Sequence, residues 1–270
     1  SQTNGMSIDS KGRIWLASFD GLTILDRSGP ILMNTDNGLP HNEVLSVIHD
    51  MQGNAWMSTR NGLARLSDMQ FQYLEIRPDS DLEMEPSSFL NMDTTVWTAN
   101  SVGGVYSYNH QGFKPVNQDP DLIDHPISCI ARTPDSSVWL GTSDFSGLMN
   151  IEQGRVSIYA DEFGLASNNI NCLAVDQNGD LIIGTSSGLS LFDGDFRTVM
   201  LDADPDKTNV TTLHVAPDGE WIVGMFNGAV YRGNEHELRP IDPALTDVAI
   251  NDVAVFKQYM IVATEGDGLF

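Results

Sequence analysis

The chain has 270 residues and a formal net charge of −23 at pH 7, from 37 acidic and 14 basic side chains. A surface of this sign repels polyanions, so the composition argues against nucleic acid as a partner and favours a ligand with neutral or cationic groups. The sequence contains no run of 18 apolar residues, and we therefore predict no direct membrane insertion by this segment.

A short phrase that contains a tryptophan recurs along the chain at spacings of 41, 41 and 42 residues. Seven copies align, and the tryptophan position is filled in chain order by Trp15, Trp56, Trp97, Trp139, Ile182, Ile222 and Ile261. The residue two places later is always small, namely Ala17, Ser58, Ala99, Gly141, Gly184, Gly224 and Ala263. A fixed period of this size predicts a repeat fold in which each unit buries its apolar face against its neighbours.

Each copy consists of short apolar runs separated by turn residues, which is typical of strands. In copy five we predict strands at 170–176, 180–185, 188–193 and 196–201. Four antiparallel strands in about 40 residues make a propeller blade. The sequence therefore predicts an all-β, seven-bladed propeller of four-stranded antiparallel blades that forms one domain over residues 1–270. A β-sandwich also has many short strands, but it would not repeat these residues at fixed offsets.

The last copy ends early, because Phe270 falls in its third strand. The few residues before the first strand are too short to supply a fourth strand to that copy. We therefore expect an incomplete last blade, and we expect the chain to be a fragment of a longer protein whose targeting segments lie elsewhere.

The repeat assigns structural roles to the tryptophans and the cysteines. The four tryptophans at the repeat position are predicted to be buried between blades. Cys129 and Cys172 occupy one repeat position, which other copies fill with Gly5, Ser46, Ser87 and Thr212. A disulfide needs Cα atoms within about 7 Å, and the inner strands of neighbouring blades lie further apart than paired strands. We therefore predict two free, buried thiols.

The segment Asn37–Val44, followed by Asp50, Gly53, Trp56 and Gly62, resembles the two-component regulator propeller repeat. The segment from Phe163 through Thr185 resembles it again. The resemblance implies an extracytoplasmic sensor propeller of a membrane-bound histidine kinase or diguanylate cyclase. It also implies a periplasmic location as part of an inner-membrane protein, with neighbouring domains of the same chain as partners. Because the repeat positions are structural, the resemblance transfers no catalytic residue.

Motifs for metals and catalysis are weak. The turn residues Asp9, Asp50 and Asp176 are predicted to accept hydrogen bonds from their own turns. The Asp202–Asp206 segment has alternating carboxylates, but it lacks the glycine and glutamate of a calcium loop and is interpreted as an exposed loop between blades. The six histidines never stand at ligand spacing, and no nucleophile elbow or phosphate loop is present. We predict no catalytic residue, no metal site and no cofactor.

Topology divides the remaining candidates between two faces. The Asp-x-x-Gly turns all lie on one face, and the varied links between second and third strands lie with the inter-blade connections on the other. On the second face, around the channel mouth, the predicted ligand-binding residues are His41, Asn42, Arg60, Asn61, Asn100, Asp144, Phe145, Asn168, Asn169, Phe226, Asn227 and Glu265. The same loops contain Phe19, Asp20, Ser101, Ser186 and Ser187. This mixture of side chains suits a polar small molecule, an oligosaccharide or a peptide.

The leading hypothesis is a non-enzymatic, ligand-binding sensor propeller of a bacterial signal-transduction protein. One alternative is a propeller enzyme of the streptogramin-lyase or lactonase type, which would need several His, Asp or Glu side chains at inner-strand ends. The other alternative is a passive protein-interaction scaffold that docks a neighbouring domain.

Overall fold

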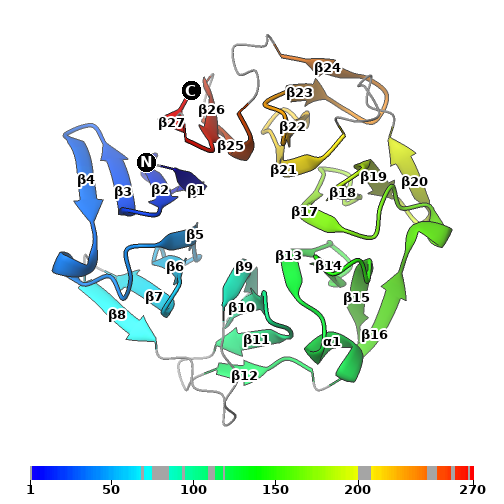
Figure 1. The fold of residues 1–270 in the computed structure, drawn as a ribbon, viewed down its shortest axis with the longest axis horizontal. Coiled ribbons are helices and arrows are strands. Elements are labelled where there is room, and N and C mark those ends of the chain that lie inside the picture. The colour runs from blue at the N-terminus through cyan, green and yellow to red at the C-terminus, as the bar shows by residue number, and fades with distance from the viewer. Residues whose placement is uncertain are drawn as a thin grey trace.

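The computed structural model describes residues 2–67, 70–74, 85–92, 95–108, 113–117, 119–199, 208–241, 248–256, 259–266 and 268–270. These residues form seven antiparallel sheets arranged in a ring around a central axis (Figure 1). In each sheet the strands pair in chain order, and the first strand lies innermost. The seven-bladed propeller predicted from the repeat is therefore confirmed.

The first three blades each contain four strands. Blade one is β1 (Thr3–Ile8), β2 (Ile14–Ser18), β3 (Gly21–Asp26) and β4 (Gly29–Met33). Blade two is β5 (Val44–His49), β6 (Ala55–Thr59), β7 (Gly62–Ser67) and β8 (Gln70–Leu74). Blade three is β9 (Pro86–Met92), β10 (Thr95–Asn100), β11 (Val105–Tyr108) and β12 (Phe113–Pro115).

Blades four to six repeat this arrangement. Blade four is β13 (Ile127–Arg132), β14 (Val138–Thr142), β15 (Leu148–Glu152) and β16 (Arg155–Tyr159). Blade five is β17 (Ile170–Val175), β18 (Leu181–Thr185), β19 (Gly188–Phe192) and β20 (Phe196–Val199). Blade six is β21 (Val210–Val215), β22 (Trp221–Met225), β23 (Val230–Gly233) and β24 (Leu238–Pro240). The strands of blade five lie within two residues of the predicted bounds.

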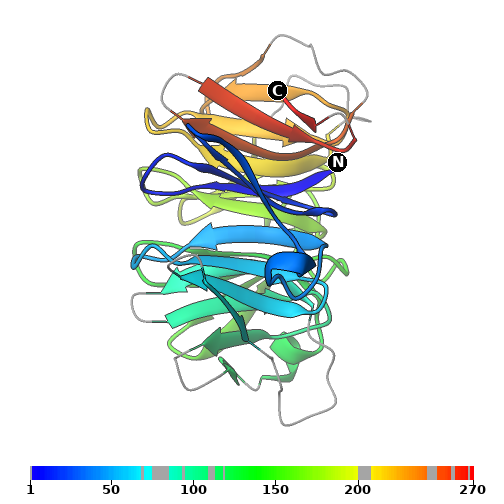
Figure 2. The ribbon, with the colours of Figure 1, turned by 90° about the vertical axis from the view of Figure 1, so that its left-hand side faces the viewer.

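The seventh blade is incomplete in the described part of the chain, as predicted. It is made of β25 (Ile250–Phe256), β26 (Tyr259–Thr264) and β27 (Gly268–Leu269). Both ends of the chain lie at the junction between this blade and blade one (Figures 1 and 2). The side chain of Asn251 donates to the carbonyl oxygen of Thr3 across that junction, at 2.7 Å. The ring is thus closed by contacts between blades rather than by a shared sheet.

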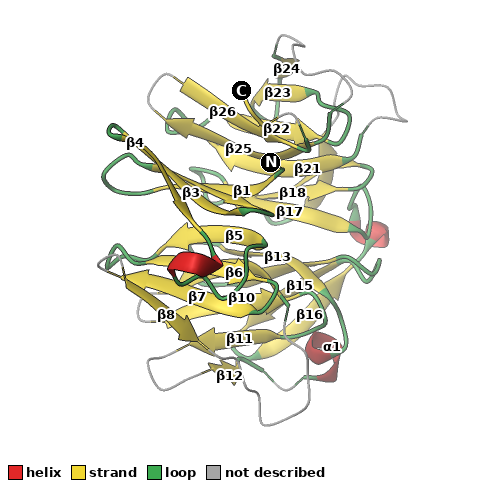
Figure 3. Ribbon diagram, turned by 60° about the vertical axis from the view of Figure 1, so that its left-hand side comes forward, coloured by secondary structure: helices red, strands yellow, loops and turns green. Residues whose placement is uncertain are grey.

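Helical segments are short and lie in the connections between blades (Figure 3). They are a 3₁₀ turn at Thr35–Asn37, the helix α1 (Pro120–Ile123) and a second 3₁₀ turn at Asp161–Phe163. None of the helices in the described ranges is long and apolar enough to cross a membrane.

Tryptophans join neighbouring blades as predicted. Trp15, Trp56 and Trp139 are buried, whereas Trp97 is half-buried against the core of blades three and four. The Trp15 ring meets His49 of blade two edge-on, with centroids 4.8 Å apart. The Trp139 ring packs on Phe192 of blade five at 4.9 Å. These rings are therefore part of the inter-blade core.

The small residue two places after the tryptophan position allows blades to approach closely. A Cβ atom added to Gly141 would lie 2.5 Å from Cys129 Sγ and 2.6 Å from Cγ2 of Ile170 in the next blade. Close backbone approach, which the repeat predicted, is therefore confirmed at this position. Cys129 and Cys172 are both free, also as predicted; Cys129 is buried, whereas Cys172 is only half-buried and differs from the prediction in this respect. Burial raises the pKa of the Cys129 thiol to about 12, so that thiol is unreactive.

Blade three differs from the predicted register. Met92 pairs with Thr95 and Ala99 pairs with Ser88, so its first hairpin is one residue shorter than those of its neighbours. Ser88, rather than the predicted Ser87, therefore shares the position of Cys129 and Cys172. Because this hairpin is one residue shorter, counting a fixed number of residues back from Trp97 gives a position one residue too early.

Candidate ligand-binding face

The face that bears the Asp-x-x-Gly turns, called here the turn face, has aspartates that are used internally. Asp9 Oδ1 accepts hydrogen bonds from the backbone N–H of Lys11 and of Arg13, both at 2.9 Å. Asp9 Oδ2 accepts from Arg13 Nε at 2.6 Å and from Trp15 Nε1 at 3.1 Å. Burial acts to raise the pKa of Asp9, but these hydrogen bonds outweigh it and lower the pKa. Asp9, Asp50 and Asp176 thus accept hydrogen bonds from their own turns, as predicted. The bonds from the tryptophan ring to Asp9 and Asp50 were not predicted.

The opposite face, called here the loop face, is attached to the innermost strands by backbone hydrogen bonds. The backbone N–H of the first residue in the link between the second and third strands donates to a carbonyl oxygen of the same blade. That carbonyl belongs to the residue immediately before the innermost strand. Arg60 N donates to Glu43 O, Phe226 N to Asn209 O and Glu265 N to Ala249 O. These bonds hold the first residue of each of these links against the start of the innermost strand.

Three predicted asparagines have side chains that already serve the backbone. Asn42 Oδ1 accepts from Thr35 N at 2.8 Å, and Asn168 Oδ1 accepts from Asp161 N at 2.6 Å. Both contacts brace the connection between two blades. Asn100 is buried, and it accepts from Glu85 N while its amide donates to Gly103 O. A structural role therefore accounts for these three asparagines, and their role in binding a ligand stays a proposal.

Charged and imidazole side chains of the predicted set lie in local pairs. Arg60 Nη1 donates to Glu43 Oε2 at 3.0 Å, and this contact raises the pKa of Arg60. His41 Nδ1 accepts from the backbone N–H of Glu43 at 3.0 Å. Glu265 is exposed, and no ion pair joins it to another side chain of the described chain. Arg60 and His41 therefore meet at Glu43, a residue that sequence reasoning did not select.

Exposed apolar side chains stand at the tips of four links on the loop face. Phe145 is 66% exposed and Phe226 is 58% exposed. Phe19 in blade one is exposed at the position equivalent to Phe226, the first residue of its link, and Val102 in blade three is exposed at the second residue of its link. Val102 was not in the predicted set, although its place in the repeat would have identified it. Because isolated surface apolar residues are common, it is their presence in four links of the same face that suggests a binding surface.

The remaining asparagines differ in the use of their side chains. Asn227 Oδ1 accepts from Ala229 N at 3.2 Å and stabilises its own turn. Asn61 has an interaction partner. Asn169 Oδ1 is covered by protein atoms but has no hydrogen-bond partner in the described structure. A covered acceptor of this kind needs a donor, so Asn169 is the predicted residue best placed to receive one.

Asp144, His125 and Ser146 form a cluster that resembles a hydrolase triad in composition only. Asp144 Oδ2 and Ser146 Oγ lie 2.7 and 2.9 Å from the same atom, His125 Nδ1. In a catalytic triad the serine and the carboxylate contact opposite nitrogens of the ring. Burial would raise the pKa of Asp144, but the hydrogen bonds from His125 and Ser146 lower it. The cluster is suited to bracing the link of blade four and not to activating a nucleophile.

A ring of inter-blade hydrogen bonds, which sequence reasoning missed, lies on the innermost strands. In most blades the residue at the β-bulge of the innermost strand donates its side chain to the first carbonyl of the next innermost strand. The pairs are Asn4 to Val44, Ser87 to Ile127, Ser128 to Ile170, Asn171 to Val210, Thr211 to Ile250 and Asn251 to Thr3. Blade two has Leu45 at this position and makes no such bond. Because asparagine, serine and threonine all fill this position, the repeat shows no constant residue there that would reveal it in the sequence.

Asp252 is the one acidic residue at the repeat position otherwise filled by Cys129, Cys172 and Thr212. Its carboxylate accepts from Met6 N in blade one at 2.7 Å and from Val253 N at 2.8 Å, and Thr212 Oγ1 of blade six lies at 3.2 Å. Burial raises the pKa of Asp252 to about 6 despite these hydrogen bonds. This carboxyl therefore connects three blades where the ring closes.

Metal ligands do not cluster in the parts of the chain that the structure describes: no group of three or more His, Cys, Asp or Glu side chains could hold an ion there. The Asp202–Asp206 segment lies outside the described residues.

Residues 38–61 and 164–187 match the two-component regulator propeller family. The chain carries two-component regulator propeller repeats. Comparison with curated protein sequences finds no significant match.

Solved structures share the propeller over nearly its whole length. Two proteins from B. thetaiotaomicron are named as extracellular domains of the hybrid two-component systems BT3049 and BT4673. The first is 17% identical with a TM-score of 0.82 over 99% of this chain, and the second is 20% identical with a TM-score of 0.80 over 100%. This chain spans 39% and 38% of their lengths. Virginiamycin B lyase from Staphylococcus aureus is 10% identical with a TM-score of 0.82, and 93% of its length is covered. At these identities the similarity establishes the fold.

Proposed function

We propose that this propeller is a non-enzymatic sensor module of a bacterial signal-transduction protein, located in the periplasm, that binds a polar small molecule, oligosaccharide or peptide on the loop face. The regulator repeats and the fold shared with extracellular domains of two-component systems support the class of protein and its place outside the cytoplasm. Further domains of the same protein would then carry the output, as a histidine kinase or a diguanylate cyclase.

The observation that supports the loop face is its recurrent aromatic and apolar tips. Phe145 of blade four and Phe226 of blade six are exposed on the two sides of blade five, whose link carries Ser186–Ser187. Aromatic surfaces beside amide and charged groups suit ligands with both apolar faces and hydrogen-bonding groups. In contrast, the carboxylates of Asp9 and Asp50 are engaged within their own turns. The negative charge of the molecule further favours neutral or cationic ligands.

The test is a thermal-shift screen with defined oligosaccharides and peptides, followed by titration of any compound that raises Tm. A double variant, Phe145→Ala with Phe226→Ala, should weaken binding at least tenfold. A matched control, Met51→Ala with Tyr259→Ala, removes two exposed apolar side chains, 79% and 62% exposed, from the turn face. Binding that survives the loop-face changes but is lost in the control pair would place the ligand on the other face.

A further inference from the structure

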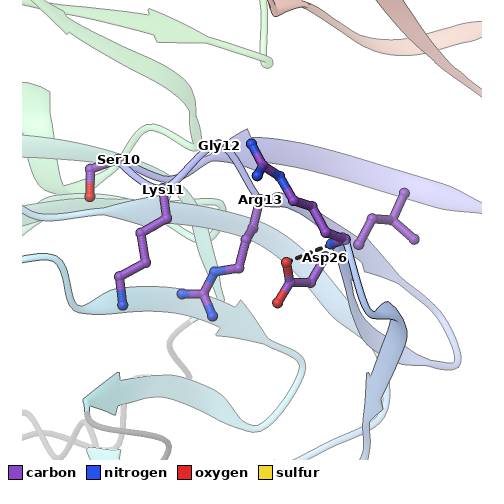
Figure 4. A pocket seen from close by; sticks show the side chains of 7 residues that line it. Ser10, Lys11, Gly12, Arg13 and Asp26 are labelled. Carbon is purple, nitrogen blue, oxygen red and sulfur yellow. Dashed lines mark hydrogen bonds between the residues drawn. The ribbon is translucent and has the colours of Figure 1, made fainter.

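A pocket of about 520 Å³ lies on the turn face of blade one (Figure 4). It is formed by the turn between β1 and β2 together with the turn between β3 and β4. Its lining residues are Ser10, Lys11, Gly12, Arg13, Leu25, Asp26 and Arg27. Ile14 pairs with Leu25, and this register places the two turns side by side at one end of the blade. The volume lies in the range of small-molecule sites.

The pocket concentrates positive charge on a strongly negative protein. Three of the 14 basic residues line it, although the chain has a net charge of −23. Arg13 is paired with Asp9 at 2.6 Å. Lys11 and Arg27 have no ion-pair partner among the described residues, whereas Arg197, Arg232 and Arg239 elsewhere are paired with carboxylates. With Asp9 and Asp26 counted, an excess of one positive charge remains around the pocket.

Arg13 is held in a fixed orientation that leaves donors available. Its Nε donates to Asp9 Oδ2, and its guanidinium carbon lies 5.3 Å from the centroid of the Trp15 ring. No contact within the described structure engages its two terminal nitrogens. Figure 4 shows the side chains of Lys11 and Arg13 extending to the same side of their turn, with Asp26 on the adjacent turn. A guanidinium held by hydrogen bonding beside an unpaired ammonium is a combination that binds oxyanions well.

We infer that this pocket binds a tetrahedral oxyanion, a phosphate or sulfate group, carried on a small molecule. Basic groups from two turns surround such an anion better than a carboxylate, because a tetrahedral group offers acceptor oxygens in several directions. The Ser10 hydroxyl supplies a further donor at the pocket rim. The volume leaves room for the molecule that carries the group. This site is separate from the proposed loop-face site, since the two lie at opposite ends of the strands.

The experiment follows the backbone amide resonances of Lys11, Gly12, Arg13 and Arg27 by NMR during titration. The probes are inorganic phosphate, inorganic sulfate, glucose 6-phosphate and acetate, at constant ionic strength and pH. We expect saturable shifts with the first three and at least tenfold weaker binding of acetate. Tighter binding of the ester than of free phosphate would identify a carried group, and equal binding would identify the free anion. Acetate binding as tightly as phosphate, or no saturable shift with any probe, would overturn the assignment.

A charge-matched pair of variants separates the pocket from the overall field. Lys11→Gln with Arg27→Gln should weaken phosphate binding at least tenfold. Lys114→Gln with Arg155→Gln changes the net charge equally at exposed positions outside the pocket, and it should change binding less than twofold. Equal weakening by both pairs would overturn the site. Because neither pair touches the loop face, its outcome is independent of the ligand proposed there.

Discussion

At the scale of single residues, the tryptophans show how one side chain serves two blades. Trp139 Nε1 donates to Thr133 Oγ1 of its own blade, at 3.3 Å, while its ring packs on Phe192 of the next blade. The Asp9–Trp15 pair does the same with a carboxylate as acceptor. The acceptor six residues before Trp15, Trp56 and Trp139 therefore reflects a hydrogen bond to the indole, whereas Asp176, which precedes Ile182, serves its turn alone.

We expect Trp139→Ala to lower the free energy of unfolding by about 3–5 kcal/mol, because it removes a buried ring that contacts Phe192 and Phe196. Urea unfolding followed by circular dichroism measures the loss. The control is Trp97→Ala, at the equivalent but half-buried position, which should cost clearly less. Equal losses at both positions would show that burial between blades does not decide the role of the tryptophan.

At the scale of strands, pairs of facing residues share a limited volume between blades. Where the second strand has Gly141, the first strand has Cys129, and where the second strand has Ala99, the first has Ser88. In both blades the next blade presents an isoleucine at the start of its first strand, Ile127 or Ile170. In these two blades the larger residue on one strand faces the smaller one on its partner, because the two side chains share the space beside the isoleucine of the next blade.

Gly141→Ala should destabilise the protein by about 1–3 kcal/mol, because the added Cβ would meet Cys129 Sγ and Ile170. Adding Cys129→Ser, which reproduces the Ser88–Ala99 pair of blade three, should restore part of that loss. The measurement is a double-mutant cycle in urea, and the prediction is a favourable coupling energy between the two changes. Strict additivity of the two effects would contradict a shared volume.

Because structural positions recur among the copies of the repeat, much of the fold could be predicted from the sequence. Less of the candidate site could be predicted in this way. The position of Gly141 and the turn role of Asp9 recur in several copies, so their function was visible as a period. The bulge residues Asn4, Ser128 and Thr211 all donate a hydrogen bond to the next blade. Because they are three different residue types, the repeat does not reveal this shared role. The pocket of Lys11 and Arg27 joins two turns separated along the chain, and no other copy has basic residues at both positions, so no periodic signal marks it.

At the scale of the whole molecule, Asp252 makes the closure of the ring sensitive to pH. Its pKa is raised to about 6 in the folded protein from an ordinary value of 3.8. A group with a raised folded pKa contributes its full stability below the unfolded pKa, and that contribution is lost as pH rises through the folded pKa. The carboxyl therefore favours folding near pH 4 and costs up to about 3 kcal/mol above pH 6, less where solvent reaches it.

Replacing Asp252 by Asn should remove this dependence. The free energy of unfolding of the Asp252→Asn variant, relative to the unchanged protein, should rise between pH 4 and pH 7, because only the unchanged protein ionises a carboxyl there. Urea unfolding at several pH values measures the difference. His49 and His214, whose pKa values burial lowers, lose their contribution as pH falls below 6.5, but they do so equally in both proteins. A pH-independent difference would refute the role of Asp252.

The missing bond at Leu45 has a consequence for local opening of the ring. The innermost strands of blades two and three, β5 and β9, touch over a shorter stretch than any other neighbouring pair of described innermost strands. Bulge residues secure the other joints. This joint instead has a long hydrogen bond, from Asn91 Nδ2 to His49 O at 3.5 Å, and packing such as that of Trp56 on Tyr108, with ring centroids 5.2 Å apart. Local opening occurs where the fewest interactions must be broken, so we expect blades two and three to separate locally before any other pair of blades.

Hydrogen exchange can test that behaviour. Amides of β5 and β9 should exchange faster than those of β17 and β21, which are joined by the Asn171 bond. Leu45→Asn, which copies the residue at the same bulge in blades one, five and seven, would let an amide reach the Pro86 carbonyl and slow exchange at the joint by up to about tenfold. If exchange is uniform around the ring in both proteins, the blades open together. The joint between β5 and β9 is then not the place where water first reaches the core.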